Sequence, residues 1–174
     1  MAILMSILYI ALVGLTAHVV GEALPRAWFH FDRAPYRAFR WERDGAIYQR
    51  LNIQRWKDVL PDKSRHARGV FKKEIRQTPT AATIERFLQE TCVAECIHWV
   101  LMLFSPGLLL FLPGTAGIVA TALYALSNIP FILIQRYNRP RLLRLYRRLT
   151  NRAGAPAAEA AHPAPQAVPA HSAS

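Results

Sequence analysis

Three long apolar blocks that contain no Lys or Arg constrain this chain more than any other feature. They run from Ala2 to Leu24, from Thr91 to Leu112 and from Gly114 to Ile134. About 20 apolar residues in an α-helix cross the roughly 30 Å hydrocarbon layer of a bilayer. All 22 Lys and Arg residues lie outside these blocks, 15 between Arg26 and Glu90 and seven after Ile134. We therefore predict an all-α integral membrane protein with three transmembrane helices.

The first block, residues 1–24, has the features of a retained membrane helix. A cleaved signal peptide is the alternative, but no Lys or Arg precedes the apolar run and no small-x-small cleavage site follows it. Only Pro113 separates the second block from the third. We expect residues 91–134 to form a helical hairpin.

The basic residues predict how the helices are oriented. Lys and Arg are enriched in cytoplasmic loops, and both the segment 25–90 and the chain after Ile134 carry them, whereas the turn at Leu112 to Gly114 has no charge. We expect a multi-pass protein of the cytoplasmic membrane with its amino terminus outside and both basic segments inside. Because anionic headgroups and phosphorylated substrates account for the net charge of +11, we expect membrane lipids as partners and no nucleic acid.

The segment 25–90 mixes aromatic and basic residues closely, as in Trp28, Tyr36 and Trp41 among Arg26, Arg37 and Arg40. This mixture is typical of amphipathic helices at the headgroup layer, and ordinary packing of the rings on each other is the alternative. The apolar spacing from Ala46 predicts a helix that ends at Pro61. Thr78 and Pro79 predict the start of the next helix.

After the third block we expect a basic juxtamembrane helix over residues 135–150 and a disordered tail over residues 151–174. The tail holds ten Ala and four Pro among its 24 residues and almost no large apolar side chains. Such a composition cannot bury enough apolar surface to form a core.

Glu95 and His98 are the candidate catalytic residues. They lie three residues apart, so on a helix they share a face about one turn inside the second span, with Thr91 a turn below. Ionisable groups at this depth are costly, which makes the pair a functional hypothesis. We expect Glu95 to orient the imidazole and His98 to act as general base toward a hydroxyl.

Two alternatives compete with catalysis by this pair. In the first, Glu95 and His98 pair with Arg residues and hold the helices together, so that salt bridges seal them from substrate. In the second, Glu-x-x-His is half of a di-iron site, but the sequence offers no second copy. We therefore expect no metal.

The residues after the third block suggest a binding site for an anion. Gln135 is followed by Arg136, Tyr137, Asn138, Arg139, Pro140 and Arg141. Arg side chains bind phosphate or carboxylate groups in bidentate fashion, and an amide adds a donor. Anchoring of the third helix by positive charge is the alternative.

These motifs together resemble the glycosyl-4,4'-diaponeurosporenoate acyltransferase family of carotenoid biosynthesis. The resemblance covers about Phe39 to Arg148 and is carried by Glu90-Thr91-x-x-Ala94-Glu95-x-x-His98-Trp99, Asn128-x-Pro130 and the run from Gln135 to Arg141. The segment Arg55-Trp56-Lys57, with Asp58 and Leu60 nearby, is similar to a Lys-Trp-Lys segment of that family.

The resemblance implies a membrane acyltransferase that moves a fatty acyl group from an activated donor onto a sugar hydroxyl of a glycosylated carotenoid acid. The donor is acyl-CoA or an acyl-carrier protein, and no cofactor is expected. We expect the phosphates of the donor to bind Arg136, Arg139 and Arg141 with Lys57. The full set of expected substrate-binding residues is Trp56, Lys57, Asp58, Thr91, Trp99, Asn128, Arg136, Tyr137, Asn138, Arg139 and Arg141.

Two further questions stay open at the level of sequence. A non-enzymatic membrane adaptor that binds anionic lipid or a partner enzyme is the alternative function. A homodimer is an open alternative to a monomer, because three helices form a thin bundle.

Overall fold

The computed structural model describes residues 1–57 and 80–160, with side chains described as far as Arg152. Within these ranges the chain contains helices and no strand. The long helices are α1 (Ala2–Ala23), α5 (Ala81–Phe104) and α6 (Gly114–Ala160). The short ones are η1 (Arg26–Trp28), η2 (Arg40–Gly45), α2 (Ala46–Arg50), α3 (Ile53–Trp56) and η3 (Ser105–Leu110). The predicted all-α fold is confirmed.

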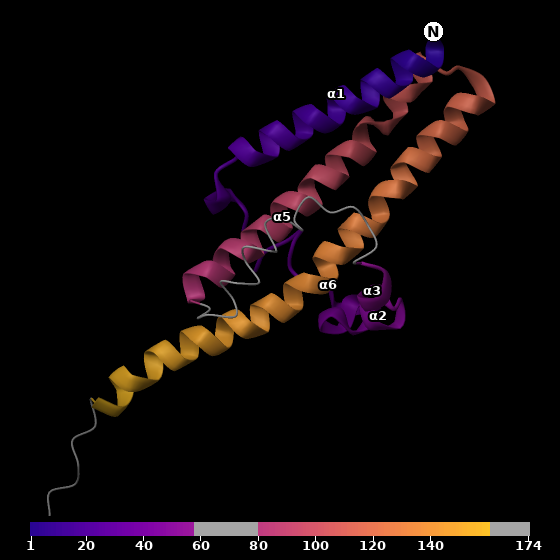
Figure 1. Ribbon diagram of the computed structural model, residues 1–174. Coiled ribbons are helices and arrows are strands. Elements are labelled where there is room, and N and C mark those ends of the chain that lie inside the picture. Colours follow the sequence, from indigo (N-terminus) through magenta and orange to yellow (C-terminus); the bar gives the residue numbers. More distant parts are fainter. Residues whose placement is uncertain (58–79, 161–174) are drawn as a thin grey trace, which may run out of the picture.

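Among the described residues, three stretches are long and apolar enough to cross a membrane, namely Ala2–Ala23, Ala81–Leu110 and Gly114–Arg152. The helices lie in a row in which α1 flanks α5 on one side and α6 flanks it on the other (Figure 1). Large apolar side chains such as Leu8, Leu103 and Leu123 point outward from the row. An outward apolar surface on each long helix is what contact with lipid requires.

The hairpin between α5 and α6 turns at Gly114, whose φ of +70° is in the left-handed region. The helix η3 continues α5 as far as Leu110 and contacts α6. Tyr9 of α1 anchors this end of the row, because its hydroxyl donates a hydrogen bond of 2.7 Å to the carbonyl oxygen of Phe104. Gly107 lies so close to the Tyr9 ring that a Cβ atom would clash with it.

The start of α5 differs from the predicted one. Thr78 and Pro79 lie outside the described residues, and the described helix begins at Ala81 with Thr80 as its N-cap. The Oγ1 atom of Thr80 accepts a hydrogen bond of 3.1 Å from the backbone N–H of Thr83. This bond satisfies one of the free donors of the first turn.

Helix α6 is longer than the sequence patterns suggested. It runs without interruption through residues 135–150, so the predicted juxtamembrane helix and the third span are one helix. The backbone stays helical to Ala160, and the prediction of disorder from Asn151 is wrong for residues 151–160. Ala has the highest helix propensity, and extending a formed helix needs no new nucleus. Residues 161–174 of the predicted tail lie outside the described part.

The segment between α1 and residue 57 folds against α6 and is more broken than predicted. The expected single helix from Ala46 is divided into α2 and α3, because Asn52 takes a left-handed conformation with φ of 54°. Figure 1 shows both short helices beside α6, on the side away from α1. Gly45, with φ of 89°, lies against Pro140 of α6, where a Cβ would sit 3.3 Å from the proline ring.

The rings of this segment do not all face the surface. Trp28 and Trp41 are exposed, whereas Phe29 and Tyr48 are buried. Tyr48 and Ile53 form a core cluster with Ile134 and Tyr137 of α6. Packing of the rings is therefore realised by Phe29 and Tyr48, whereas the place of Trp28 and Trp41 at the headgroup layer stays a prediction.

Candidate functional site

Glu95 lies at the centre of a buried charge cluster between α5 and α6. Its Oε1 atom accepts a hydrogen bond of 2.8 Å from Nε of Arg136, and its Oε2 atom accepts one of 2.6 Å from Nη2 of Arg139. Arg139 also donates to both the hydroxyl and the carbonyl oxygen of Thr91, each at 3.0 Å. The spacing of three between Arg136 and Arg139 places both guanidinium groups on one face of α6.

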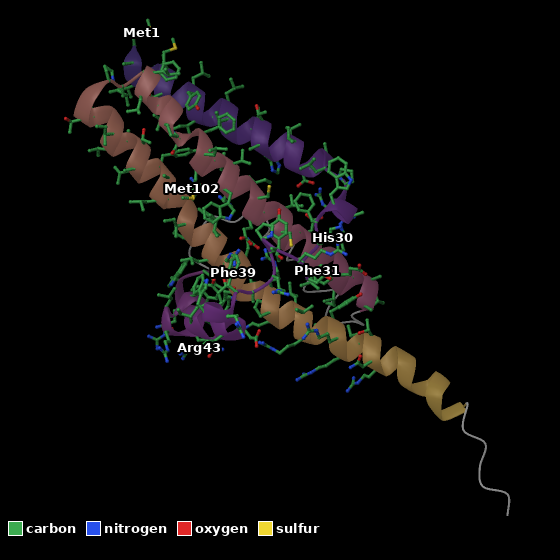
Figure 2. The ribbon with its side chains drawn as sticks, turned by 180° about the vertical axis from the view of Figure 1, so that it is seen from behind. Met1, His30, Phe31, Phe39, Arg43 and Met102 are labelled. Atoms are coloured by element: carbon green, nitrogen blue, oxygen red, sulfur yellow. The ribbon has the colours of Figure 1, made fainter. Side chains whose placement is uncertain are left out.

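A second carboxylate reaches the cluster from the segment before α2. Nη1 of Arg136 donates a short hydrogen bond to Oε1 of Glu42. The hydroxyl of Tyr48 donates to the same oxygen at 2.7 Å, and the backbone N–H of Phe39 donates to Oε2 at 3.0 Å. Figure 2 shows Phe39 against α6 and Arg43 on the outer side of the short helices.

The cluster is sealed and electrically neutral. Glu95 is 0% exposed, Glu42 1%, Arg139 4% and Arg136 9%. Every nitrogen of both guanidinium groups donates, since Arg136 Nη2 bonds to the carbonyl oxygen of Pro35 and Arg139 Nη1 to that of Tyr36, each at 2.8 Å. Two carboxylates and two guanidinium groups that bond to one another form a structural clamp, because removing either carboxylate would leave a buried charge without its partner.

The predicted hydrogen bond between Glu95 and His98 is therefore not formed. Glu95 does not orient His98, because its oxygens accept from Arg136, Arg139 and, at 3.4 Å, the indole N–H of Trp99. Arg136 and Arg139 bind carboxylates of this chain, and binding of the donor phosphates by these two residues stays a prediction. The alternative in which Glu95 pairs with Arg residues to hold helices together is the one realised.

The phenol of Tyr48 is held neutral by its place in the cluster. Burial and the hydrogen bond to Glu42 raise the pKa of Tyr48 above its ordinary value of 10.0. Burial likewise raises the pKa of Tyr36, whose carbonyl accepts from Arg139. Both phenols thus keep their protons far into the alkaline range.

His98 lies about one helical turn further along α5 and is half-buried. Its Nδ1 atom is 2.9 Å from Oδ1 of Asn128 on α6, and its ring stacks on Phe131 with centroids 4.6 Å apart and an interplanar angle of 8°. No hydrogen bond to Nε2 forms within residues 1–57 and 80–152. Asn128, and not Glu95, therefore bonds to the imidazole of His98.

A separate group of side chains surrounds the ring of Tyr137, which is 2% exposed. The guanidinium of Arg141 lies 3.9 Å from the ring centroid and the Nζ atom of Lys57 5.5 Å from it. The Tyr137 hydroxyl donates to Oε1 of Gln54 at 3.3 Å. Unlike Arg136 and Arg139, Arg141 forms no ion pair with any acid in the described part of the chain.

The remaining predicted substrate-binding residues are scattered. Trp56 donates its indole N–H to the carbonyl oxygen of Leu51 at 3.1 Å and packs on the cluster around Tyr48. Trp99 is 51% exposed on the outer face of α5. Asn138 is half-buried on α6, and Asp58 lies outside the described residues.

Sequence reasoning missed Glu42, Tyr48 and Phe131. Glu42 stands among Arg40, Trp41 and Arg43, which suggested an exposed charged segment. In the sequence, only the spacing of six between Glu42 and Tyr48 could have suggested that these residues interact. The fold shows in addition that Glu42 faces Arg136 of α6.

Comparison with known proteins identifies the family. A sequence model described as glycosyl-4,4'-diaponeurosporenoate acyltransferase matches residues 25–148. The chain belongs to this family. Proteins of that name from Staphylococcus aureus strains RF122 and MRSA252 are each 29% identical over 150 residues, which cover 83% of this chain and 88% of theirs. The protein of strain USA300 is 28% identical over the same share.

Membership of an acyltransferase family confirms the predicted enzyme class. The matched range begins after α1 and contains the charge cluster, the His98–Asn128 pair and the Tyr137 cluster. No solved structure matches this chain.

Proposed function

We propose that this acyltransferase moves a fatty acyl group from a thioester donor onto a sugar hydroxyl of a glycosylated, carotenoid-type lipid at the cytoplasmic face of the cell membrane. The observation that carries the proposal is His98. It is a half-buried imidazole inside an apolar span, with Nδ1 bonded to Asn128 and Nε2 without a partner among the described residues. The relatives named above supply the class of acceptor.

The chemistry that follows needs one base and no covalent acyl-enzyme. Nε2 of His98 takes the proton from the acceptor hydroxyl as its oxygen attacks the thioester carbonyl carbon. The new bond is the ester C–O bond, the C–S bond breaks, and the thiolate leaves with the proton returned by Nε2. General base catalysis of this kind contributes on the order of 10² to 10⁴ in rate.

The donor in this proposal is acyl-CoA or an acyl-carrier protein, and its phosphates bind at Arg141 and Lys57. Both cations lie against the Tyr137 ring. Like charges held close together favour an anion between them. Asn128 and Arg141 are thirteen residues apart on α6, so the pantetheine arm has to extend about 20 Å along the helix to reach His98.

The orientation that we expect from the basic residues agrees with this placement. In our proposal α1 begins outside the cell, while residues 25–57 and the basic part of α6 lie on the cytoplasmic side, where thioester donors are found. The acceptor enters from the bilayer, because the cavity at the charge cluster has a volume of only about 30 Å³ and is lined partly by buried ions. Binding sites for drug-sized ligands measure about 300–1,000 Å³.

Mass spectrometry of reaction products tests the proposal. Purified protein in nanodiscs is incubated with palmitoyl-CoA and a glycosylated polyene carboxylic acid, and the acylated glycoside is sought. We expect an ester on the sugar and release of free CoA in equal amount. Release of CoA without the ester, or acylation of a phospholipid instead of the glycoside, would contradict the proposed acceptor.

A further inference from the structure

We infer that Asn128 is a positioning residue that fixes the tautomer and the ring orientation of His98. The inference deepens the proposed function, because it specifies which imidazole nitrogen receives the proton of the acceptor. It also changes the role of Asn128, which the sequence had suggested as a substrate-binding residue.

The amide of Asn128 has a defined orientation. Its Nδ2 atom donates a hydrogen bond of 2.8 Å to the carbonyl oxygen of Tyr124, one turn earlier on α6. The Oδ1 atom therefore faces His98, at 2.9 Å from Nδ1. An amide oxygen can only accept, so Nδ1 must carry the hydrogen and Nε2 must carry the lone pair when the ring is neutral.

The opposite orientation of the amide is costly at this depth. It would bring Oδ1 against the carbonyl oxygen of Tyr124, which already accepts from the Ser127 hydroxyl, and leave Oδ1 without a hydrogen. Asn128 is 4% exposed, so water cannot compensate. A buried polar group without a partner costs about 1–3 kcal/mol, which is enough to keep one orientation dominant.

Phe131 completes the positioning. Its ring lies parallel to the imidazole at 4.6 Å and limits rotation of the His98 ring out of its plane. When Nε2 takes a proton, the imidazolium rests on the face of the phenyl ring, where a cation is attracted by the ring quadrupole. The Nδ1–H bond to Asn128 stays in place during the transfer, so the proton leaves from the nitrogen that received it.

The tautomer is measured directly by NMR. Protein labelled with ¹⁵N and ¹³C in His is prepared in micelles, and the His98 signals are assigned by their loss in His98→Gln. We expect the Nδ1–H tautomer in the unmodified protein and in Asn128→Asp, which keeps an acceptor oxygen. In Asn128→Leu we expect a mixture of tautomers, because the acceptor is gone. Nε2–H as the main tautomer of the unmodified protein would overturn the inference.

Kinetics supply the second measurement. Loss of the partner that orients a metal-bound His costs about tenfold to a hundredfold in activity. By analogy, we expect Asn128→Leu to lower kcat by a similar factor with KM for the acceptor unchanged. Asn128→Asp should retain much more activity. Ser127→Ala is the matched control, because the Ser127 hydroxyl donates to the same Tyr124 carbonyl at 2.7 Å without bonding to His98. Equal kcat values for Asn128→Leu and Ser127→Ala would refute the positioning role.

The two proposals fail in distinguishable ways. If His98→Gln keeps full activity, the proposed base is wrong, while the NMR result still decides the tautomer. If His98→Gln is inactive and Asn128→Leu raises only KM, His98 remains the base and Asn128 binds substrate instead.

Discussion

The Oε1 atom of Glu95 accepts a hydrogen bond of 2.8 Å from Nε of Arg136, 41 residues further along the chain. This contact joins α5 to α6 at the level where the segment before α2 folds against them. Arg136 also pairs with Glu42, and this second contact joins that segment to α6. Glu95, which the sequence suggested as a catalytic residue, therefore holds the helices together, and our proposal assigns the general base to His98 alone.

Glu95→Gln should destabilise the protein strongly. The change leaves two buried guanidinium groups with a single carboxylate, and breaking a buried ion pair costs about 3–5 kcal/mol. Thermal unfolding in detergent measures the effect. Glu22→Gln is the matched control, because the Glu22 side chain pairs with Arg26 but is 67% exposed. Similar unfolding midpoints for the two variants would show that the cluster is not a clamp.

The ionisation of Tyr48 in the unfolded chain should lower the free energy of unfolding at high pH. Its pKa is raised above the 10.0 of an unfolded phenol, so the unfolded chain loses the proton first as the pH increases. The stabilisation is complete below about pH 10 and decreases above it. We expect Tyr48→Phe to lose less stability than the unmodified protein between pH 9 and pH 11 in thermal unfolding. An equal loss would assign the alkaline effect to other groups.

Gly107→Ala should loosen the contact between α1 and the hairpin. The new Cβ would clash with the rigid ring of Tyr9, and overpacking of this kind costs about 1–3 kcal/mol. Gly14→Ala is the control in the same region, since nothing lies within 4 Å of its Cβ position. Unfolding midpoints in detergent compare the two. A midpoint for Gly107→Ala equal to that of Gly14→Ala would contradict the packing of α1.

Arg141→Gln should raise KM for acyl-CoA by about tenfold, because a hydrogen bond to a charged group contributes about 1.5–3 kcal/mol. The KM for acyl-pantetheine, which lacks the nucleotide phosphates, should not change. Arg144→Gln, an exposed Arg on the same helix, controls for the loss of one charge near the membrane. The comparison is made in zwitterionic nanodiscs, so that anionic headgroups do not contribute. An equal rise for both donors would place the phosphate site elsewhere.

The sequence predicted the membrane spans well because their signal is local. A run of 20 apolar residues needs no partner to be recognised, and the turn at Pro113 separates two such runs. Helix ends were less predictable. The basic residues after Ile134 suggested a separate element, yet helix propensity continues α6 through them to Ala160.

Many residues of the candidate site were predicted from the sequence, but the residues to which they bond were not. Glu95, His98, Asn128 and Arg136 were all singled out, and the shared helical face of Glu95 and His98 suggested that they bond to each other. The packing of α5 against α6 gives different pairs, since it brings Glu95 opposite Arg136 and His98 opposite Asn128. Periodicity within one helix carries no information about which residue of a second helix faces it.

The rate of a single turnover in His98→Gln tests the central claim most directly. The variant is reconstituted with saturating donor and acceptor, beside His18→Gln, which changes a half-buried His of α1. We expect a loss of about 100-fold or more for His98→Gln, an unchanged unfolding midpoint, and normal activity for His18→Gln. A rate within threefold of the unmodified protein for His98→Gln would contradict the assignment of the general base.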